Sequence, residues 1–225
     1  MRRLLAPLAV LSVALSTLGG CGGDAAGSPD GDIKSTAPDP LQRLVDGNKR
    51  YVTSKCAHPD GSPERRTEVA KGQKPFAIVL GCADSRVPPE IVFDQGLGDL
   101  FVVRVAGNVS DDAVVGSIEY AAEHLGATLL VVLGHERCGA CDAALHGGEA
   151  PGHLHAVIDP IVPAVRDTAA DPGDRLDNVV RRNVRNVVHD LSENKPVLEH
   201  LVEAHKLRIV GARYDLDTGE VEILK

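Results

Sequence analysis

The sequence predicts an α/β fold with a mostly parallel central sheet of about five strands and helices on both faces of that sheet. Short apolar runs bounded by glycine or proline recur along the chain, as expected of strands that are buried on both faces. Amphipathic segments with helical spacing separate these runs, which favours right-handed crossovers between parallel strands. Aromatic residues make up only 3% of the chain and Trp is absent, so the core is expected to be aliphatic.

Each expected strand is a short run of aliphatic side chains. The runs at residues 76–80 and 129–133 are each followed directly by a glycine, and both are typical of central parallel strands. A turn at residues 217–219 precedes the last run, which predicts an antiparallel hairpin strand at the edge of the sheet. Strands are expected at residues 76–80, 100–105, 129–133, 207–212 and 221–224.

The expected helices follow from capping residues and apolar stripes. Pro40 suits the first turn of a helix, while Asp111 offers an N-cap and Gly126 a stop for a second one. Residues 56–74 are polar and interrupted by proline, and residues 87–97 are expected to form a loop or a short helix. Helices are expected at residues 40–51, 111–125, 154–165 and 174–191, with a further helix beginning at Pro196.

The N-terminal segment differs in character from the rest of the chain. Arg2 and Arg3 precede an apolar run at residues 4–18 and then Gly19, Gly20 and Cys21, which is the order of a secretory signal. Residues 18–21 also resemble a bacterial lipobox, in which cleavage precedes a cysteine that is then acylated. Residues 1–20 are therefore expected to be a lipoprotein signal peptide and Cys21 the lipidated residue; an ordinary signal peptide cut nearby is the alternative.

Composition then divides the remainder into a tether and one globular domain. Residues 21–39 are rich in small and polar side chains and are expected to form a flexible tether, whereas residues 40–225 have the length of one domain. The protein is expected to be exported and lipid-anchored on the extracytoplasmic side of the cell membrane. A formal net charge of -8 argues against nucleic acid as a partner and leaves the lipid as the only expected membrane contact.

Three side chains indicate a metal site. Cys82 follows the strand expected at 76–80, whereas His135 and Cys138 follow the strand expected at 129–133. The carboxyl ends of parallel strands are the usual ligand site of an open α/β sheet, at the point where strand order reverses. If a helix begins after Gly134, His135 and Cys138 share one helical face. Two thiols and an imidazole suit one tetrahedral Zn²⁺ with one open position.

Asp84 and Arg86 are the expected catalytic pair. The Arg86 guanidinium can take both carboxylate oxygens of Asp84 and hold that carboxylate off the metal. Asp84 would then be a zinc ligand only in a closed state, and in the open state it would accept the hydrogen of zinc-bound hydroxide. The alternative is a plain structural ion pair. The backbone N–H of Gly139, at the start of a helix, is a candidate donor to substrate oxygens.

Four segments together resemble the β-class carbonic anhydrases. They are residues 82–86, 99–108, 135–138 and 211–219, within a resemblance that covers residues 40–225. The resemblance implies a catalytic domain that hydrates CO2 reversibly to bicarbonate and a proton, with the Asp84–Arg86 dyad at its zinc site. Gln73 matches a glutamine that contacts bound anion in plant-type relatives. The family also implies a homodimer or homotetramer, with helices from the N-terminal end packing across the dimer.

The resemblance also bears on the resting state of the site. Some relatives have an inhibited state in which the counterpart of Asp84 binds zinc and bicarbonate occupies a pocket lined partly by Trp. Because this chain has no Trp, the open, active arrangement is expected at neutral pH.

Two alternative functions remain open at this stage. Relatives with the same zinc site hydrolyse carbon disulfide or carbonyl sulfide. The shape of the access tunnel selects between these substrates and CO2, and the sequence does not show that shape. The second alternative is a non-enzymatic exported lipoprotein that binds zinc or acts in thiol redox chemistry, because Cys138 and Cys141 form a C-x-x-C pair. Cys56 and Cys141 have no assigned role, and no histidine is favoured as a proton carrier.

Overall fold

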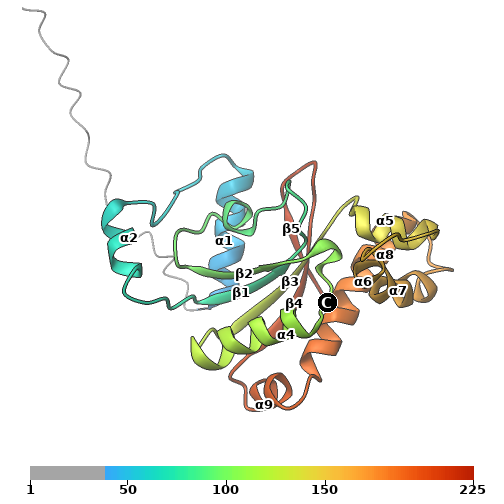
Figure 1. The fold of residues 1–225 in the computed structure, drawn as a ribbon. Coiled ribbons are helices and arrows are strands. Elements are labelled where there is room, and N and C mark those ends of the chain that lie inside the picture. The colour runs from blue at the N-terminus through green and yellow to red at the C-terminus, as the bar shows by residue number, and fades with distance from the viewer. Residues whose placement is uncertain (1–38) are drawn as a thin grey trace, which may run out of the picture. The chain divides into compact units, whose positions relative to one another are not determined.

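The computed structural model describes residues 39–225 (Figure 1). The expected signal peptide, Cys21 and all of the expected tether except Asp39 lie outside the described residues. Within residues 39–225, none of the helices combines the length and the apolar character that crossing a membrane requires.

The described chain forms one five-stranded sheet in the order β2-β1-β3-β4-β5. Neighbouring strands are parallel except β4 and β5, which form the expected antiparallel edge pair. All five expected strands are confirmed, with boundaries shifted by at most two residues. The strands are β1 (Ala77–Gly81), β2 (Leu100–Arg104), β3 (Leu129–His135), β4 (Arg208–Tyr214) and β5 (Val221–Leu224).

Helices connect and cover these strands. The α-helices are α1 (Pro40–Val52), α2 (Pro63–Val69), α3 (Pro89–Val92), α4 (Asp112–Glu119), α5 (Gly139–His146), α6 (His155–Ile158), α7 (Val162–Asp167), α8 (Arg175–Ser192) and α9 (Val197–Glu203). Two 3₁₀ turns, η1 (Ala106–Asn108) and η3 (Asp159–Ile161), and a π-helical turn, η2 (Tyr120–His124), complete the set.

Two expectations about helices need correction. The single helix expected at 154–165 is divided into α6, η3 and α7, because Pro160 and Pro163 interrupt the helical hydrogen bonds. Helix α2 was not expected, since it buries no residue and carries no apolar stripe; the Ser62 cap and Pro63 define its start. The other expected helices are present, and the one expected at 111–125 continues from α4 into the turn η2.

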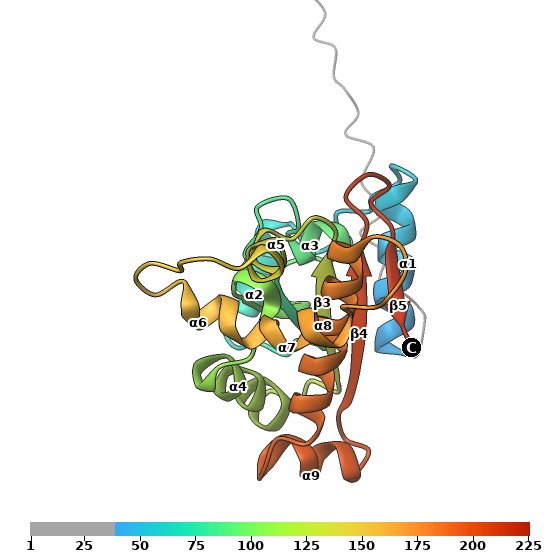
Figure 2. The same cartoon turned by 90° about the vertical axis from the view of Figure 1, so that its right-hand side faces the viewer.

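Helices cover both faces of the sheet, as expected. Side chains alternate along each central strand, so that Leu80 and Val132 pack against α4, α8 and α9. Their neighbours Val79 and Val131 point to the opposite face and pack against Leu44 of α1 and against α3. Figure 2 shows α1 and α8 on opposite sides of the strands. Burial on both faces explains why these strands are uninterrupted aliphatic runs.

The strand order places a ligand site between β1 and β3. The chain passes from β1 outward to β2 and then returns to the other side of β1 to form β3. Strand order therefore reverses at this point, and the carboxyl ends of β1 and β3 lie side by side. Close packing of α8 behind β3 depends on Gly134, where an added Cβ would lie 2.5 Å from Val184 Cγ2.

Candidate metal centre

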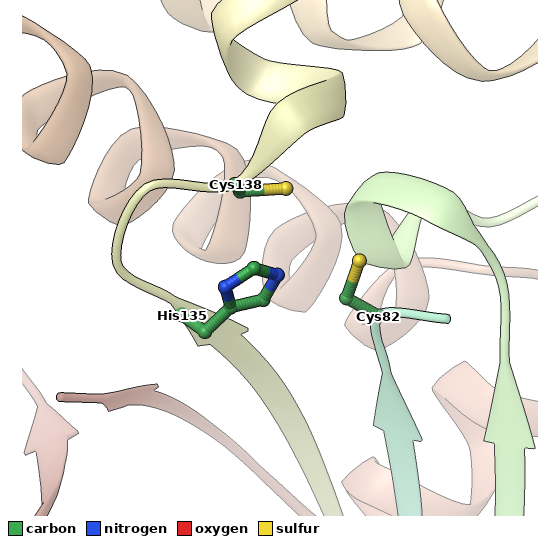
Figure 3. A group of neighbouring side chains, drawn as sticks. All are labelled: Cys82, His135 and Cys138. Carbon is green, nitrogen blue, oxygen red and sulfur yellow. The ribbon is translucent and has the colours of Figure 1, made fainter. Parts of the chain in front are cut away.

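Cys82, His135 and Cys138 converge at this reversal point. Cys82 directly follows β1, His135 is the last residue of β3, and Cys138 is the N-cap of α5. Their ligand atoms all lie within 4.8 Å of one another, and the side chains point toward a common centre (Figure 3). All three residues are buried, with exposed fractions of 5%, 0% and 1%.

The structure corrects how His135 and Cys138 come together. They do not share a helical face, because β3 continues through Gly134 and His135, which pair with Arg213 and Tyr214 of β4. A turn then follows in which Arg137 has a φ of +48°, and this turn brings Cys138 back over the end of the strand. The two ligands are therefore presented by a strand end and a helix cap.

Hydrogen bonding of His135 leaves one ring nitrogen available. Its Nδ1 lies 2.7 Å from the Glu136 carbonyl oxygen, which can only accept, so Nδ1 carries the hydrogen. The Nε2 atom keeps its lone pair and has no hydrogen-bond partner among residues 39–225, although it is fully buried. A buried acceptor without a partner is costly, and a bound cation beside the two cysteines would satisfy it.

The thiol pKa values also fit a cation site. Hydrogen bonding with Cys138 and burial raise the pKa of Cys82 to about 12. The neighbouring Cys141, together with burial, raises the pKa of Cys138 to about 11. Both groups are thus neutral thiols unless a cation stabilises their thiolates. Two sulfurs and one imidazole nitrogen form a donor set that zinc prefers.

A main-chain donor supports Cys82 from the side of η1. The N–H of Gly107 lies 3.4 Å from Cys82 Sγ, and the buried Asn183 of α8 donates to the Gly107 carbonyl at 2.9 Å. Gly107 has a φ of +72°, and an added Cβ would lie 2.7 Å from Ile161 Cδ1. Glycine is therefore required here by both conformation and space.

The expected Asp84–Arg86 pair is present. Arg86 donates from Nε to Oδ1 at 2.9 Å and from Nη2 to Oδ2 at 2.7 Å, and its backbone N–H donates to Oδ1 at 2.9 Å. Hydrogen bonds from Arg86 hold the pKa of Asp84 well below its usual range. Oδ2 of Asp84 lies 3.8 Å from Nε2 of His135, so the carboxylate is directly beside the three ligand residues.

Arg104 holds the backbone of residues 82–84. The sequence analysis assigned it no role. It donates from Nε to the Cys82 carbonyl at 2.9 Å and from Nη2 to the Asp84 carbonyl at 2.6 Å. Its position at the end of β2 could have indicated this role, because the parallel neighbours β1 and β2 end at the same edge of the sheet, where the ligand candidates lie.

The two expected substrate-binding residues differ in position. Gly139 is the first residue of α5, so its N–H belongs to the turn that lacks intrahelical partners. Gln73 is exposed in the loop before β1, at the opposite end of that strand from Cys82. Within one chain Gln73 therefore does not join the site, and its contact with an anion stays a prediction.

The other two cysteines among residues 39–225 are free. Cys56 is half-buried and Cys141 is buried, and neither forms a disulfide. Cys141 packs with Ile161, Val179 and Val180 in the cluster behind the ligands, so it occupies the place of a small apolar side chain.

Comparison with known proteins identifies the family. The carbonic anhydrase family model matches residues 77–221, which is more than half of the chain and includes all three ligand candidates. The chain belongs to the carbonic anhydrase family. Carbonic anhydrase 2 of Mycobacterium tuberculosis is 45% identical to it over 180 residues, covering 78% of this chain and 87% of the relative. The carbonic anhydrase of Mycolicibacterium smegmatis is 42% identical over 184 residues, covering 80% and 89%.

Solved structures place this carbonic anhydrase in the β class. A tetrameric β-carbonic anhydrase of Sordaria macrospora matches with a TM-score of 0.67 and 26% identity, covering 82% of this chain and 96% of that one. The Coccomyxa β-carbonic anhydrase in complex with acetazolamide matches with a TM-score of 0.65 and 29% identity, covering 82% and 86%. The class and fold expected from the sequence are confirmed.

Proposed function

We propose that this β-class carbonic anhydrase holds one zinc ion between Cys82, His135 and Cys138 and uses Asp84 and Arg86 as its catalytic pair. The reaction is the reversible hydration of CO2 to bicarbonate and a proton. The observation that carries the proposal is the buried Nε2 of His135, which lacks a partner among residues 39–225 and faces two cysteines. A bound zinc ion supplies Lewis acidity that makes a water molecule a nucleophile near neutral pH.

The role of Asp84 follows from its charge state and its restraint. Because Arg86 keeps the pKa of Asp84 low, the carboxylate is ionised at neutral pH and can only accept hydrogen bonds. It accepts a hydrogen bond from the attacking water and thereby directs an oxygen lone pair toward CO2. Arg86 keeps both carboxylate oxygens occupied, which opposes direct binding of Asp84 to the metal and keeps the site open.

Gly139 is proposed to stabilise the product oxygens. Its N–H is in the first turn of α5, directly after the ligand Cys138, and a fixed donor of this kind stabilises developing negative charge without rearrangement. Gln73 is proposed to contact the anion only as a residue of a second copy, because its own chain places it at the far end of β1.

Metal content and activity should be measured on one purified sample of the full chain. We expect one zinc per chain and rapid CO2 hydration in a stopped-flow assay with a pH indicator. A Cys82→Ser variant should lose both. A zinc-loaded sample without acceleration would contradict the proposal, and release of sulfide from carbonyl sulfide would instead favour the sulfur-substrate alternative.

The location of the enzyme is a separate part of the proposal. The order of residues 2–21 supports export and lipidation of Cys21, and lipid would then be the only membrane anchor. Labelling cells with a fatty-acid analogue should mark the wild-type protein but not Cys21→Ser. A protein recovered in soluble form without label would favour the ordinary signal peptide.

Self-association is also proposed, as a homodimer or homotetramer. Strand β2 is at the edge of the sheet and its apolar residues are half-exposed. Ile91 and Leu97, in and after α3, are 58% and 50% exposed, which is unusual for large apolar side chains in a monomer. Light scattering on the purified enzyme should give two or four chains per particle, and a monomeric mass would refute this part.

A further inference from the structure

Glu136 is fixed to the neighbouring strand through both its main chain and its side chain. Its backbone N–H donates to the Tyr214 carbonyl at 3.0 Å. One carboxylate oxygen accepts from Arg213 Nη2 at 2.6 Å, and the other accepts from the Leu216 N–H at 3.1 Å. Glu136 therefore has little freedom to move relative to β4 and the residues that follow it.

The carbonyl of this fixed residue is the acceptor for His135. The contact between His135 Nδ1 and the Glu136 carbonyl is 2.7 Å long, and it decides which ring nitrogen is left for a metal. If the carbonyl moved, the ring could rotate or change tautomer, and Nε2 would no longer face Cys82 and Cys138. Partners of this kind orient metal-binding histidines and tune their affinity.

Arg213 is itself held in place from a third element. It is only 8% exposed, and besides Glu136 it donates to Asp177 of α8 at 2.6 Å and to Asp215 at 3.3 Å. Its side chain thus joins α8, β4 and the turn between the metal ligands. A buried guanidinium with several carboxylate partners is strongly restrained in geometry.

We propose that Glu136 and Arg213 are positioning residues, which fix the Glu136 carbonyl so that His135 presents Nε2 to the metal. This inference rests on the proposed function, because it requires a metal at Cys82, His135 and Cys138. It gives a positioning role to Glu136, although the His-x-x-Cys spacing of residues 135–138 does not itself specify the residue type at this position.

The nearby pair of Arg137 and Asp217 provides a contrast. It is bidentate, with bonds of 2.9 and 2.8 Å, but the two side chains are 51% and 73% exposed. Exposed pairs of this kind contribute little to stability. Glu136 and Arg213 therefore restrain the turn at residues 135–138, whereas the exposed Arg137–Asp217 pair contributes little.

The test measures metal exchange and the ligand field of the metal. Dissociation of zinc into excess chelator and the visible spectrum after cobalt substitution are recorded for wild type, Glu136→Ala, Asp177→Ala and Asp217→Ala. Glu136→Ala is expected to release zinc about 10- to 100-fold faster than wild type and to shift the cobalt bands. Asp177→Ala removes another of the carboxylates that hold Arg213 and is expected to accelerate release less than Glu136→Ala does, because Arg213 keeps Glu136 and Asp215 as partners. Asp217→Ala breaks only the exposed pair and is expected to release zinc at the wild-type rate.

A second variant keeps the test decisive if Glu136→Ala does not fold. Glu136→Gln preserves an acceptor for Arg213 but removes the charge, and it should release zinc at a rate between those of wild type and Glu136→Ala. Wild-type exchange and an unchanged cobalt spectrum in the Glu136 variants would overturn the inference, as would equal acceleration by Asp217→Ala. A wild-type protein that binds no zinc would instead overturn the proposed function.

Discussion

The guanidinium of Arg86 binds both carboxylate oxygens of Asp84, with Nε 2.9 Å from Oδ1 and Nη2 2.7 Å from Oδ2. The paired carboxylate is 3.8 Å from Nε2 of His135, which is near enough to reach a metal there after a small rotation. In the proposed mechanism this pair keeps the fourth position at the zinc site open.

Replacement of Arg86 by Ala should close the site. Without the guanidinium, Asp84 is free to bind the metal as a fourth ligand and exclude water. We expect CO2 hydration to fall by about 100-fold or more, as for misplaced catalytic groups in general. Because Asp84 would then take the place of water, the visible spectrum after cobalt substitution should differ from that of wild type and should lose the pH dependence that an ionisable water gives.

Arg181 offers a matched control for this experiment. It binds Glu222 in the same bidentate manner, at 2.9 and 2.7 Å, and also donates to Asp177 at 2.7 Å, with a side chain that is 24% exposed. Arg181→Ala is expected to keep its activity. Unchanged catalysis and coordination in Arg86→Ala, or Asp84 bound to zinc in the wild type at pH 7.5, would show that Arg86 does not keep the site open.

Cys141 should be dispensable for both zinc binding and activity. It lies in the apolar cluster next to the ligands and is 1% exposed, so Ala is a better replacement than Ser, whose buried hydroxyl would cost stability. Cys141→Ala is expected to retain wild-type zinc content and CO2 hydration, whereas Cys138→Ala should lose both. Loss of zinc in Cys141→Ala would revive the thiol-redox interpretation.

Asn183 should affect metal affinity through Gly107. Its side-chain amide holds the Gly107 carbonyl at 2.9 Å, and the Gly107 N–H donates to Cys82 Sγ at 3.4 Å. Asn183→Ala is expected to weaken zinc binding about 10-fold, as outer partners of metal ligands commonly do. Competition with a zinc indicator measures this directly.

Asn48 is the control for the effect of losing a buried amide. It is 6% exposed and donates to the Val92 and Gly219 carbonyls. Asn48→Ala should lower the free energy of unfolding by about 1–3 kcal/mol, because buried main-chain groups lose their partner, while zinc affinity stays unchanged. Equal effects of the two variants on zinc affinity would argue against a specific role for Asn183.

Asp94 should make folding stability depend on pH. Burial alone would raise the pKa of Asp94, but hydrogen bonds from the Ala57 N–H, Arg50 and the His58 N–H outweigh it and hold the pKa below its usual value. A lowered folded-state pKa stabilises the fold above the unfolded-state pKa of about 3.9, and this stability is lost as pH falls through the folded-state pKa.

The measurement is urea unfolding of Asp94→Asn and wild type across pH. At pH 7 the variant should be less stable by about 2 kcal/mol, as for hydrogen bonds to charged groups, and the difference should shrink below about pH 4. Asp46 is the control, because its side chain is 39% exposed, accepts among residues 39–225 only from Gln42 at 2.9 Å and lies 3.8 Å from Lys49; Asp46→Asn should show no such difference. A stability difference that is constant with pH would contradict this role for Asp94.

Much of the fold and the ligand set could be predicted from local pattern. Strands buried on both faces must be continuous aliphatic runs, so β1 and β3 are visible in the sequence. The ligand candidate Cys82 directly follows β1, and His135 is the last residue of β3. Asp84 and Arg86 are two residues apart in one turn, so their pairing could also be anticipated. The helical face expected for His135 and Cys138 was wrong, because pairing of His135 with Tyr214 extends β3 through the ligand.

The α/β class, the strands and the three ligand candidates follow from the sequence alone, because each of these depends on neighbours within a few residues. How the ligand candidates are held depends on contacts between elements that are distant in the sequence. The Glu136–Arg213 contact joins residues 77 apart, and the Asn183–Gly107 contact joins residues 76 apart. Such contacts depend on how α8 and β4 pack against the end of β3. Local periodicity does not encode this packing, because the spacing of side chains describes one element and not the elements it contacts.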